Sequence, residues 1–159
     1  MATIIVEDGS IVAGANSYIS EANLTTYATD RGITIVGTKA DLLIQAMDYI
    51  EQQYFIGLKY TQDQPLQWPR AGVEIDEFPI AVTEIPTLLI EALAETALAI
   101  DAGNSPIADL ERTKQQVTVG PVSVTYAEGG NSAVVVRKIS NKLAKLITGS
   151  GGINFEVTR

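Results

Sequence analysis

The sequence predicts a mainly α-helical protein, a bundle of about four helices with one β-hairpin, an extended N-terminal arm and a C-terminal tail. Apolar residues recur at spacings of three and four in several segments, which is the period of an amphipathic helix. In 115–127 the period changes to two. Of the 159 residues, 46% are hydrophobic and 19% charged, which is enough apolar material for the core of one domain. We therefore expect one domain over 1–148, followed by a flexible linker and docking tail over 149–159.

The N-terminal part is expected to be an arm with a turn at Asp8 and Gly9, followed by a short helix. Ser20 can accept a hydrogen bond from a backbone N–H and is the predicted N-cap of that helix. The helix should run through Asp30, because Gly32 just beyond it suits a helix end.

Two further helices are predicted on either side of a long irregular segment. Thr38 is the expected N-cap of the second helix, which should end at Gly57. This helix carries one apolar stripe, which comprises Leu43, Ala46, Met47, Ile50 and Tyr54. Pro86 opens the third helix and Gly103 ends it. Its many alanines predict a central helix packed on more than one side. Glu91 and Glu95 share one face, expected to meet solvent or another subunit.

The segment 58–85 contains prolines and the single tryptophan and is expected to be a long loop. Trp68 has two interpretations, an anchor that fills the core or, with Arg70 beside it, an inter-subunit contact. The anchor is favoured. Glu74, Asp76 and Glu77 form an acidic cluster without the spacing of a calcium loop.

The segment 115–127 predicts a β-hairpin that turns at Gly120 and Pro121. Because a lone hairpin is marginally stable, it should pack on the helices or join strands of neighbouring copies. A fourth helix should follow over 132–147, with lysines on its outer face. The tail contains alternating apolar residues, Ile153, Phe155 and Val157. This pattern suits strand addition to a partner's sheet, and a disordered end is the alternative; the two stay open.

Cysteine and histidine are both absent, so a thiolate or imidazole metal site and Ser-His or Cys-His catalysis are excluded. There is no phosphate loop, dinucleotide motif or nucleophile elbow. We therefore expect a protein that is not an enzyme, with no catalytic residues, no cofactor and no metal. Because no basic targeting segment precedes the first apolar stretch, a soluble protein made in the cytoplasm is expected.

The net charge of −8 is unevenly distributed. Residues 1–130 carry −12 and residues 131–159 carry +4. The basic end could dock on an acidic partner or be a solvated helix face, and the two alternatives stay open. The candidate partner-binding cations of this end are Arg137, Lys138, Lys142 and Lys145.

Several short motifs occur in order over residues 4 to about 147; they are Val6-Glu7-Asp8-Gly9, Gly14-Ala15-Asn16-Ser17-Tyr18, Trp68-Pro69-Arg70-Ala71-Gly72-Val73, Ile85-Pro86, Val119-Gly120-Pro121-Val122 and Thr125-Tyr126-Ala127. In these the sequence resembles the small neck proteins of tailed bacteriophages, often labelled DnaT-like single-stranded-DNA-binding proteins. The resemblance implies a head–tail connector: a homododecameric ring between the portal protein and a tail, stopper or terminator protein. DNA would pass through it without specific binding, and the resemblance supplies no catalytic residues.

In that interpretation Glu74, Asp76 and Glu77 face the channel, where like charge keeps DNA from sticking. The cations of the fourth helix and the tail then hold an acidic portal or a neighbouring subunit. The protein would lie in the virion neck, and in the host cytoplasm before assembly. The alternative is a single-stranded DNA-binding accessory protein of phage replication, which differs from a connector in showing salt-sensitive DNA affinity.

Overall fold

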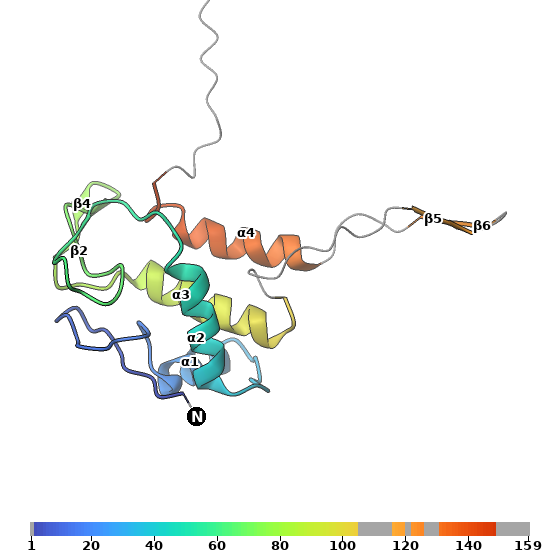
Figure 1. Cartoon of the computed structure of the whole chain (residues 1–159), viewed down its shortest axis with the longest axis horizontal. Coiled ribbons are helices and arrows are strands. Elements are labelled where there is room, and N and C mark those ends of the chain that lie inside the picture. The colour runs from blue at the N-terminus through green and yellow to red at the C-terminus, as the bar shows by residue number, and fades with distance from the viewer. Residues whose placement is uncertain (1, 105–115, 120–121, 126–130, 149–159) are drawn as a thin grey trace, which may run out of the picture.

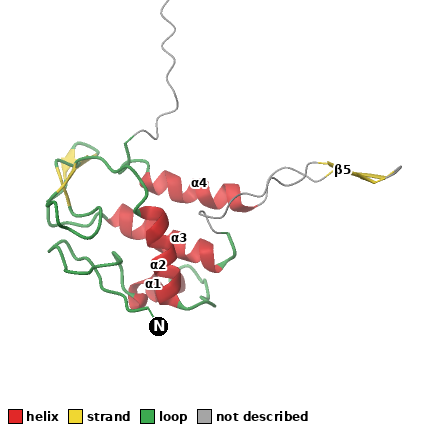
Figure 2. Ribbon diagram, viewed as in Figure 1, coloured by secondary structure: helices red, strands yellow, loops and turns green. Residues whose placement is uncertain are grey.

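The computed structural model describes residues 2–104, 116–119, 122–125 and 131–148, with side chains over 2–104 and 137–148. The helices are α1 (Glu21–Thr29), α2 (Lys39–Ile50), α3 (Thr87–Asp101) and α4 (Asn131–Leu143). The strands are β1 (Leu58–Lys59), β2 (Arg70–Ala71), β3 (Glu74–Ile75), β4 (Phe78–Pro79), β5 (Gln116–Val119) and β6 (Val122–Thr125). The prediction of a mainly α protein with four helices and a hairpin is confirmed at this level (Figure 2). No helix in the described ranges is long and apolar enough to cross a membrane.

Helix α3 lies at the centre, with α2 and α4 packed on it (Figure 1). Every residue from 92 to 99 is buried, and four of these are alanine. Small side chains let neighbouring helices approach on several sides of α3, as its composition predicts. Leucines of α3, α2 and α4 fill the spaces between the helices, and Leu43, Leu89, Leu93 and Leu143 are almost completely buried.

Helix α1 follows its sequence signals, whereas α2 departs from them. The Ser20 hydroxyl accepts a hydrogen bond from the Asn23 N–H at 3.1 Å, so Ser20 is the predicted N-cap. Thr38 precedes α2 without making a side-chain cap bond. The end of α2 was also predicted wrongly, because the helix ends at Ile50 instead of reaching Gly57.

The N-terminal segment is not a projecting arm but a loop closed on itself and packed against the body. The N–H of Glu7 donates to the Ser17 carbonyl at 2.8 Å, which joins the two ends of the loop. The buried Glu7 carboxylate accepts hydrogen bonds from the N–H groups of Gly9, Ile11 and Val12 at 2.8–2.9 Å. These local bonds replace the solvent contacts that an extended arm would make.

The expected long loop contains two small antiparallel sheets, β1 with β2 and β3 with β4. Trp68 is fully buried between them and the helices, and its ring meets Phe55 edge-on with centroids 6.0 Å apart. The core-anchor interpretation of Trp68 is therefore confirmed, and the inter-subunit interpretation is wrong because no part of the side chain reaches the surface.

Strands β5 and β6 form the predicted hairpin, and the pairing of Val119 with Val122 leaves two residues between them. Among the described elements, the hairpin contacts none of the helices (Figure 1). The tail with Ile153, Phe155 and Val157 lies outside the described residues, so its predicted strand addition stays a prediction.

Candidate nucleic-acid interface

The lysines of α4 and of the turn after it face acids of the same chain. The Lys138 Nζ lies 2.7 Å from a Glu95 carboxylate oxygen, Lys142 pairs with Glu91, and the Lys145 Nζ lies 2.6 Å from Asp76. We call these three ion pairs the α4 clasp. Glu91 and Glu95 thus face α4, not solvent or another subunit as expected. The lysines predicted to dock on a portal hold α4 against α3 and the β3–β4 hairpin.

Glu95 is the most buried member of the clasp. It also accepts a hydrogen bond from the Tyr27 hydroxyl at 2.9 Å and lies 3.8 Å from the Arg31 guanidinium, which stacks 3.4 Å above the Tyr27 ring. Burial alone would raise the pKa of Glu95, but the hydrogen bonds from Lys138 and Tyr27 and the nearby lysine charges outweigh it, and this pKa is lowered. The ionised carboxylate is therefore stabilised in the folded state.

Reversing one charge of the clasp should destabilise the protein where the pair is shielded from water. The side chains of Lys142 and Glu91 are 22% and 31% exposed, so Lys142→Glu should lower the free energy of unfolding by about 1 kcal/mol. Adding Glu91→Lys to Lys142→Glu should restore most of the lost free energy of unfolding, which urea unfolding measures. Lys145 and Asp76 are 54% and 62% exposed and provide the control, for which the same reversal should change little. Equal losses at both pairs would contradict this description of the clasp.

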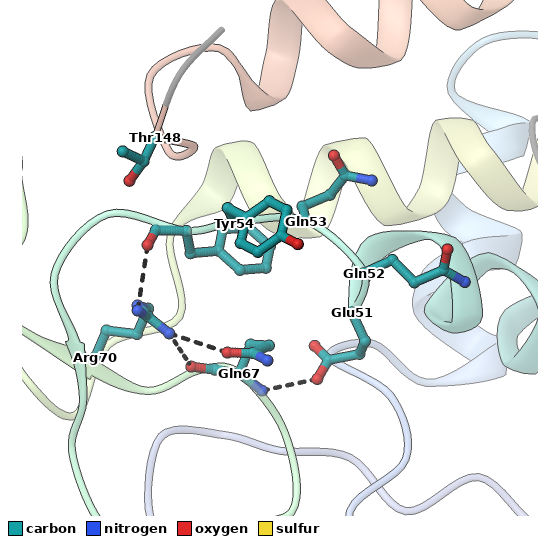
Figure 3. A pocket seen from close by; sticks show the side chains of 8 residues that line it. Glu51, Gln52, Gln53, Tyr54, Gln67, Arg70 and Thr148 are labelled. Carbon is teal, nitrogen blue, oxygen red and sulfur yellow. Dashed lines mark hydrogen bonds between the residues drawn. The ribbon is translucent and has the colours of Figure 1, made fainter.

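An open pocket of about 540 Å³ lies where the chain leaves α2 (Figure 3). Its lining comes from the end of α2, the approach to β2 and the end of the α4 region, and comprises Glu51, Gln52, Gln53, Tyr54, Phe55, Gln67, Arg70 and Thr148. The Tyr54 side chain is 83% exposed, although its spacing predicts a core residue. The early end of α2 explains this, because the residues after Ile50 no longer follow the helical period.

The segment that carries Tyr54 is held on one side by the residues after α4. The N–H of Thr148 donates to the Tyr54 carbonyl at 2.6 Å, and the N–H of Ile56 donates to the Leu146 carbonyl at 2.9 Å. These bonds fix the backbone beneath the exposed ring. Among the described residues, the Tyr54 hydroxyl makes no hydrogen bond, so both the ring and the hydroxyl are available to a ligand.

Arg70 is buried and holds the pocket wall together. The Nε atom donates to the Ile56 carbonyl, and one terminal nitrogen donates to the carbonyls of Phe55 and Gly57. The other terminal nitrogen donates to the backbone carbonyl and the side-chain oxygen of Gln67. The five donor–acceptor distances are 2.7–3.2 Å. A guanidinium has five N–H donors, and these bonds use all five. The predicted partner-binding role of Arg70 is therefore corrected: the side chain supplies positive charge near the pocket but no free donor.

Glu51 forms another part of the wall. One carboxylate oxygen accepts from the Tyr18 hydroxyl at 2.5 Å and the other from the Gln67 N–H at 2.8 Å. Burial raises the pKa of Glu51 above its ordinary value, although these hydrogen bonds and the charges of Lys59 and Arg70 oppose the rise. The carboxylate is thus fixed in position at the edge of an open pocket.

The remaining predicted site residues are spread over the surface. Glu74, Asp76 and Glu77 are exposed around the β3–β4 turn, where Asp76 and Glu77 have positive φ angles of 53° and 70°. Arg137 is exposed on α4. Within the ranges that the structure describes, no group of three or more acidic side chains could hold a metal ion.

Sequence reasoning missed the residues that build the pocket. Tyr54 was assigned to the core, and nothing local marks Glu51 or Gln67, which meet only through the fold. The one available signal is the polar pair Gln52 and Gln53, which begins two residues after Ile50 and is unsuited to a continued apolar stripe.

The fold and the pocket define a small, mainly α-helical protein that presents an exposed aromatic ring beside amide and carboxylate groups. The chain belongs to the family described as "Putative DnaT-like ssDNA binding protein", whose model matches residues 2–159. No curated protein and no solved structure matches the chain.

This family membership overturns the main functional interpretation of the sequence. The family description names single-stranded DNA binding, not a structural subunit of a phage neck. The predicted homododecameric ring, its portal and tail or stopper partners, and the passage of DNA without binding are therefore corrected. The α4 clasp removes one physical argument for them, because the basic helix already has acidic partners within its own chain.

Proposed function

We propose that this protein binds single-stranded DNA as an accessory protein of replication, acting by binding and not by catalysis. The observation that carries the proposal is membership of the DnaT-like family over residues 2–159. The absence of histidine and cysteine excludes Ser-His and Cys-His catalysis and a thiolate metal site, which agrees with a binding role.

Tyr54 is the proposed stacking platform for one base. Stacking of a base on an aromatic side chain contributes about 1–3 kcal/mol and needs no particular sequence. The Tyr54 ring is 83% exposed and its backbone is fixed by the residues after α4. Because this backbone is already fixed, binding has to order only the Tyr54 side chain and not the segment that carries it, which favours affinity.

Phosphate contacts are expected to contribute less than stacking. The net charge is −8, the lysines of the α4 clasp are paired with acids, and the donors of Arg70 are used within the protein. In a plot of the logarithm of the binding constant against the logarithm of the salt concentration, each neutralised phosphate of a single strand contributes about −0.7 to the slope. With few such contacts, we expect a shallow salt dependence.

Tyr54→Ala should weaken binding of single-stranded DNA by roughly 5- to 100-fold, corresponding to loss of one stacked base. Tyr54→Phe keeps the ring and should bind nearly as well as the unchanged protein. Fluorescence anisotropy with a labelled oligonucleotide of about 12 nucleotides measures both affinities.

Phe78→Ala is the matched control, because Phe78 is also an exposed aromatic residue, at 73%, but lies on β4 outside the pocket. It should leave the affinity unchanged. Equal affinities for Tyr54→Ala and the unchanged protein would contradict the placement of the site at Tyr54.

A further inference from the structure

We propose that the pocket beside Tyr54 receives one nucleobase from the bound strand and prefers guanine, through the Glu51 carboxylate and the Gln67 side-chain amide. The inference rests on the proposed function and adds the identity of the base that the site selects. It follows from which hydrogen-bonding groups of the pocket are fixed and which remain free.

The acceptor of the site is the Glu51 carboxylate. An ionised carboxylate has about four lone-pair positions on its two oxygens. The Tyr18 hydroxyl occupies one position on the first oxygen, and the Gln67 N–H occupies one on the second. Each oxygen can therefore accept another hydrogen bond, and the two existing bonds prevent the group from rotating. Glu51 lines the open pocket, so the remaining positions can be reached by a ligand (Figure 3).

The donor of the site is the Gln67 amide nitrogen. The Arg70 guanidinium donates to the Gln67 Oε1 at 3.1 Å, which fixes the oxygen end of the amide. The opposite end must then be the –NH₂ group, a donor. Among the described residues, this –NH₂ group has no partner. The pocket thus places a fixed double acceptor and a free donor near the Tyr54 ring, as Figure 3 shows.

Guanine matches this set of groups better than the other bases. Its Watson–Crick edge has two adjacent donors, N1–H and the N2 amino group, which can pair with the two oxygens of one carboxylate, and O6 can accept from the amide. Adenine and cytosine offer one amino group, and thymine offers one imino N–H. A bidentate pair of this kind contributes about 1–3 kcal/mol of discrimination.

The charges of the pocket favour a base over a phosphate. The five donors of Arg70 are already bonded, so it cannot clamp a phosphate, and the Glu51 carboxylate would repel one. The positive charge of Arg70 lies near Glu51 and partly balances it. A neutral base edge with donors can therefore enter where an anion cannot.

The test compares oligonucleotides of thymine that differ at one central position, which holds guanine, hypoxanthine or thymine. Hypoxanthine keeps N1–H and O6 but lacks the N2 amino group. We expect the guanine oligonucleotide to bind about 10-fold more tightly than the all-thymine one, with hypoxanthine between them. Gln67→Met should reduce the preference, whereas Gln45→Met, the same substitution at an exposed position of α2 outside the pocket, should leave it intact. Thermal unfolding checks that both variants remain folded.

The outcomes separate this inference from the function on which it rests. Equal binding of all three oligonucleotides by a protein that does bind single strands would overturn the guanine preference and leave the proposed function standing. Failure to bind any of them would overturn the proposed function, and this inference with it. An unchanged preference in folded Gln67→Met would remove Gln67 from the site.

Discussion

Replacing Arg70 with methionine is expected to lower the free energy of unfolding by about 3–5 kcal/mol. The substitution removes five hydrogen bonds and leaves the partly buried carbonyls of Phe55, Ile56 and Gly57 without these donors. Methionine has a similar length, so the loss reports mainly on these polar contacts and not on a cavity. Urea unfolding of the variant measures the effect.

Arg31→Met is the matched control. The Arg31 side chain is 37% exposed, lies 3.8 Å from Glu95 and stacks on the Tyr27 ring, so its removal should cost only about 1 kcal/mol. Arg70→Lys should recover part of the loss, because an ammonium group has three donors where the guanidinium has five. Equal stabilities of the Arg70→Met and Arg31→Met variants would show that the hydrogen bonds of Arg70 do not stabilise the pocket wall.

Gly9→Ala is expected to destabilise the protein by roughly 3 kcal/mol or more. A Cβ atom at Gly9 would lie 1.9 Å from the carbonyl oxygen of Thr83, so one of the two backbone segments must move. Gly9 also has a φ angle of +100°, which other residues rarely adopt. Moving it would disturb the loop around the buried Glu7 carboxylate, to which the Gly9 N–H donates.

Gly32→Ala separates the two causes. Gly32 has a φ angle of +67°, but nothing lies within 4 Å of the position of its Cβ atom. Gly32→Ala should therefore lower the free energy of unfolding only by the penalty for a positive φ angle, about 1–2 kcal/mol. Thermal or urea unfolding compares the variants, and a loss at Gly9 no larger than at Gly32 would contradict the close approach of Thr83.

The helices were predictable because their signals are local. Ser20 accepts the N–H three residues away, and the apolar stripe of α2 extends over neighbouring turns of one segment. The hairpin of β5 and β6 follows from alternation around two turn residues, which again involves only adjacent positions. Each of these features depends on residues that are close in sequence.

The pocket and the clasp could not be predicted from the sequence because they join distant segments. Lys138 meets Glu95 across 43 positions, Lys145 meets Asp76 across 69, and Tyr18 meets Glu51 across 33. No periodicity links such residues. When these contacts are not known, a basic helix in an acidic chain suggests docking between subunits. In the folded protein, the lysines form ion pairs with acids of the same chain.

The net charge of −8 disfavours the phosphate contacts from which many proteins gain their affinity for nucleic acids. Stacking on an exposed ring requires no net positive charge, so an acidic protein can still bind single-stranded DNA in this way. The helical spacing of Tyr54 predicts a core position, whereas the residue lies exposed at a pocket, so the sequence gives no sign of a stacking residue here.

The most direct test of the proposed function is the affinity of the unchanged protein for one sequence as a single strand and as a duplex, at about 50 and 200 mM salt. In the duplex the bases are stacked and paired, so Tyr54 cannot take them without opening the helix. We expect the single strand to bind more tightly at both concentrations, with an affinity that falls only modestly between them. Equal affinities for the two forms, or no binding to the single strand at the lower salt, would contradict the proposed function.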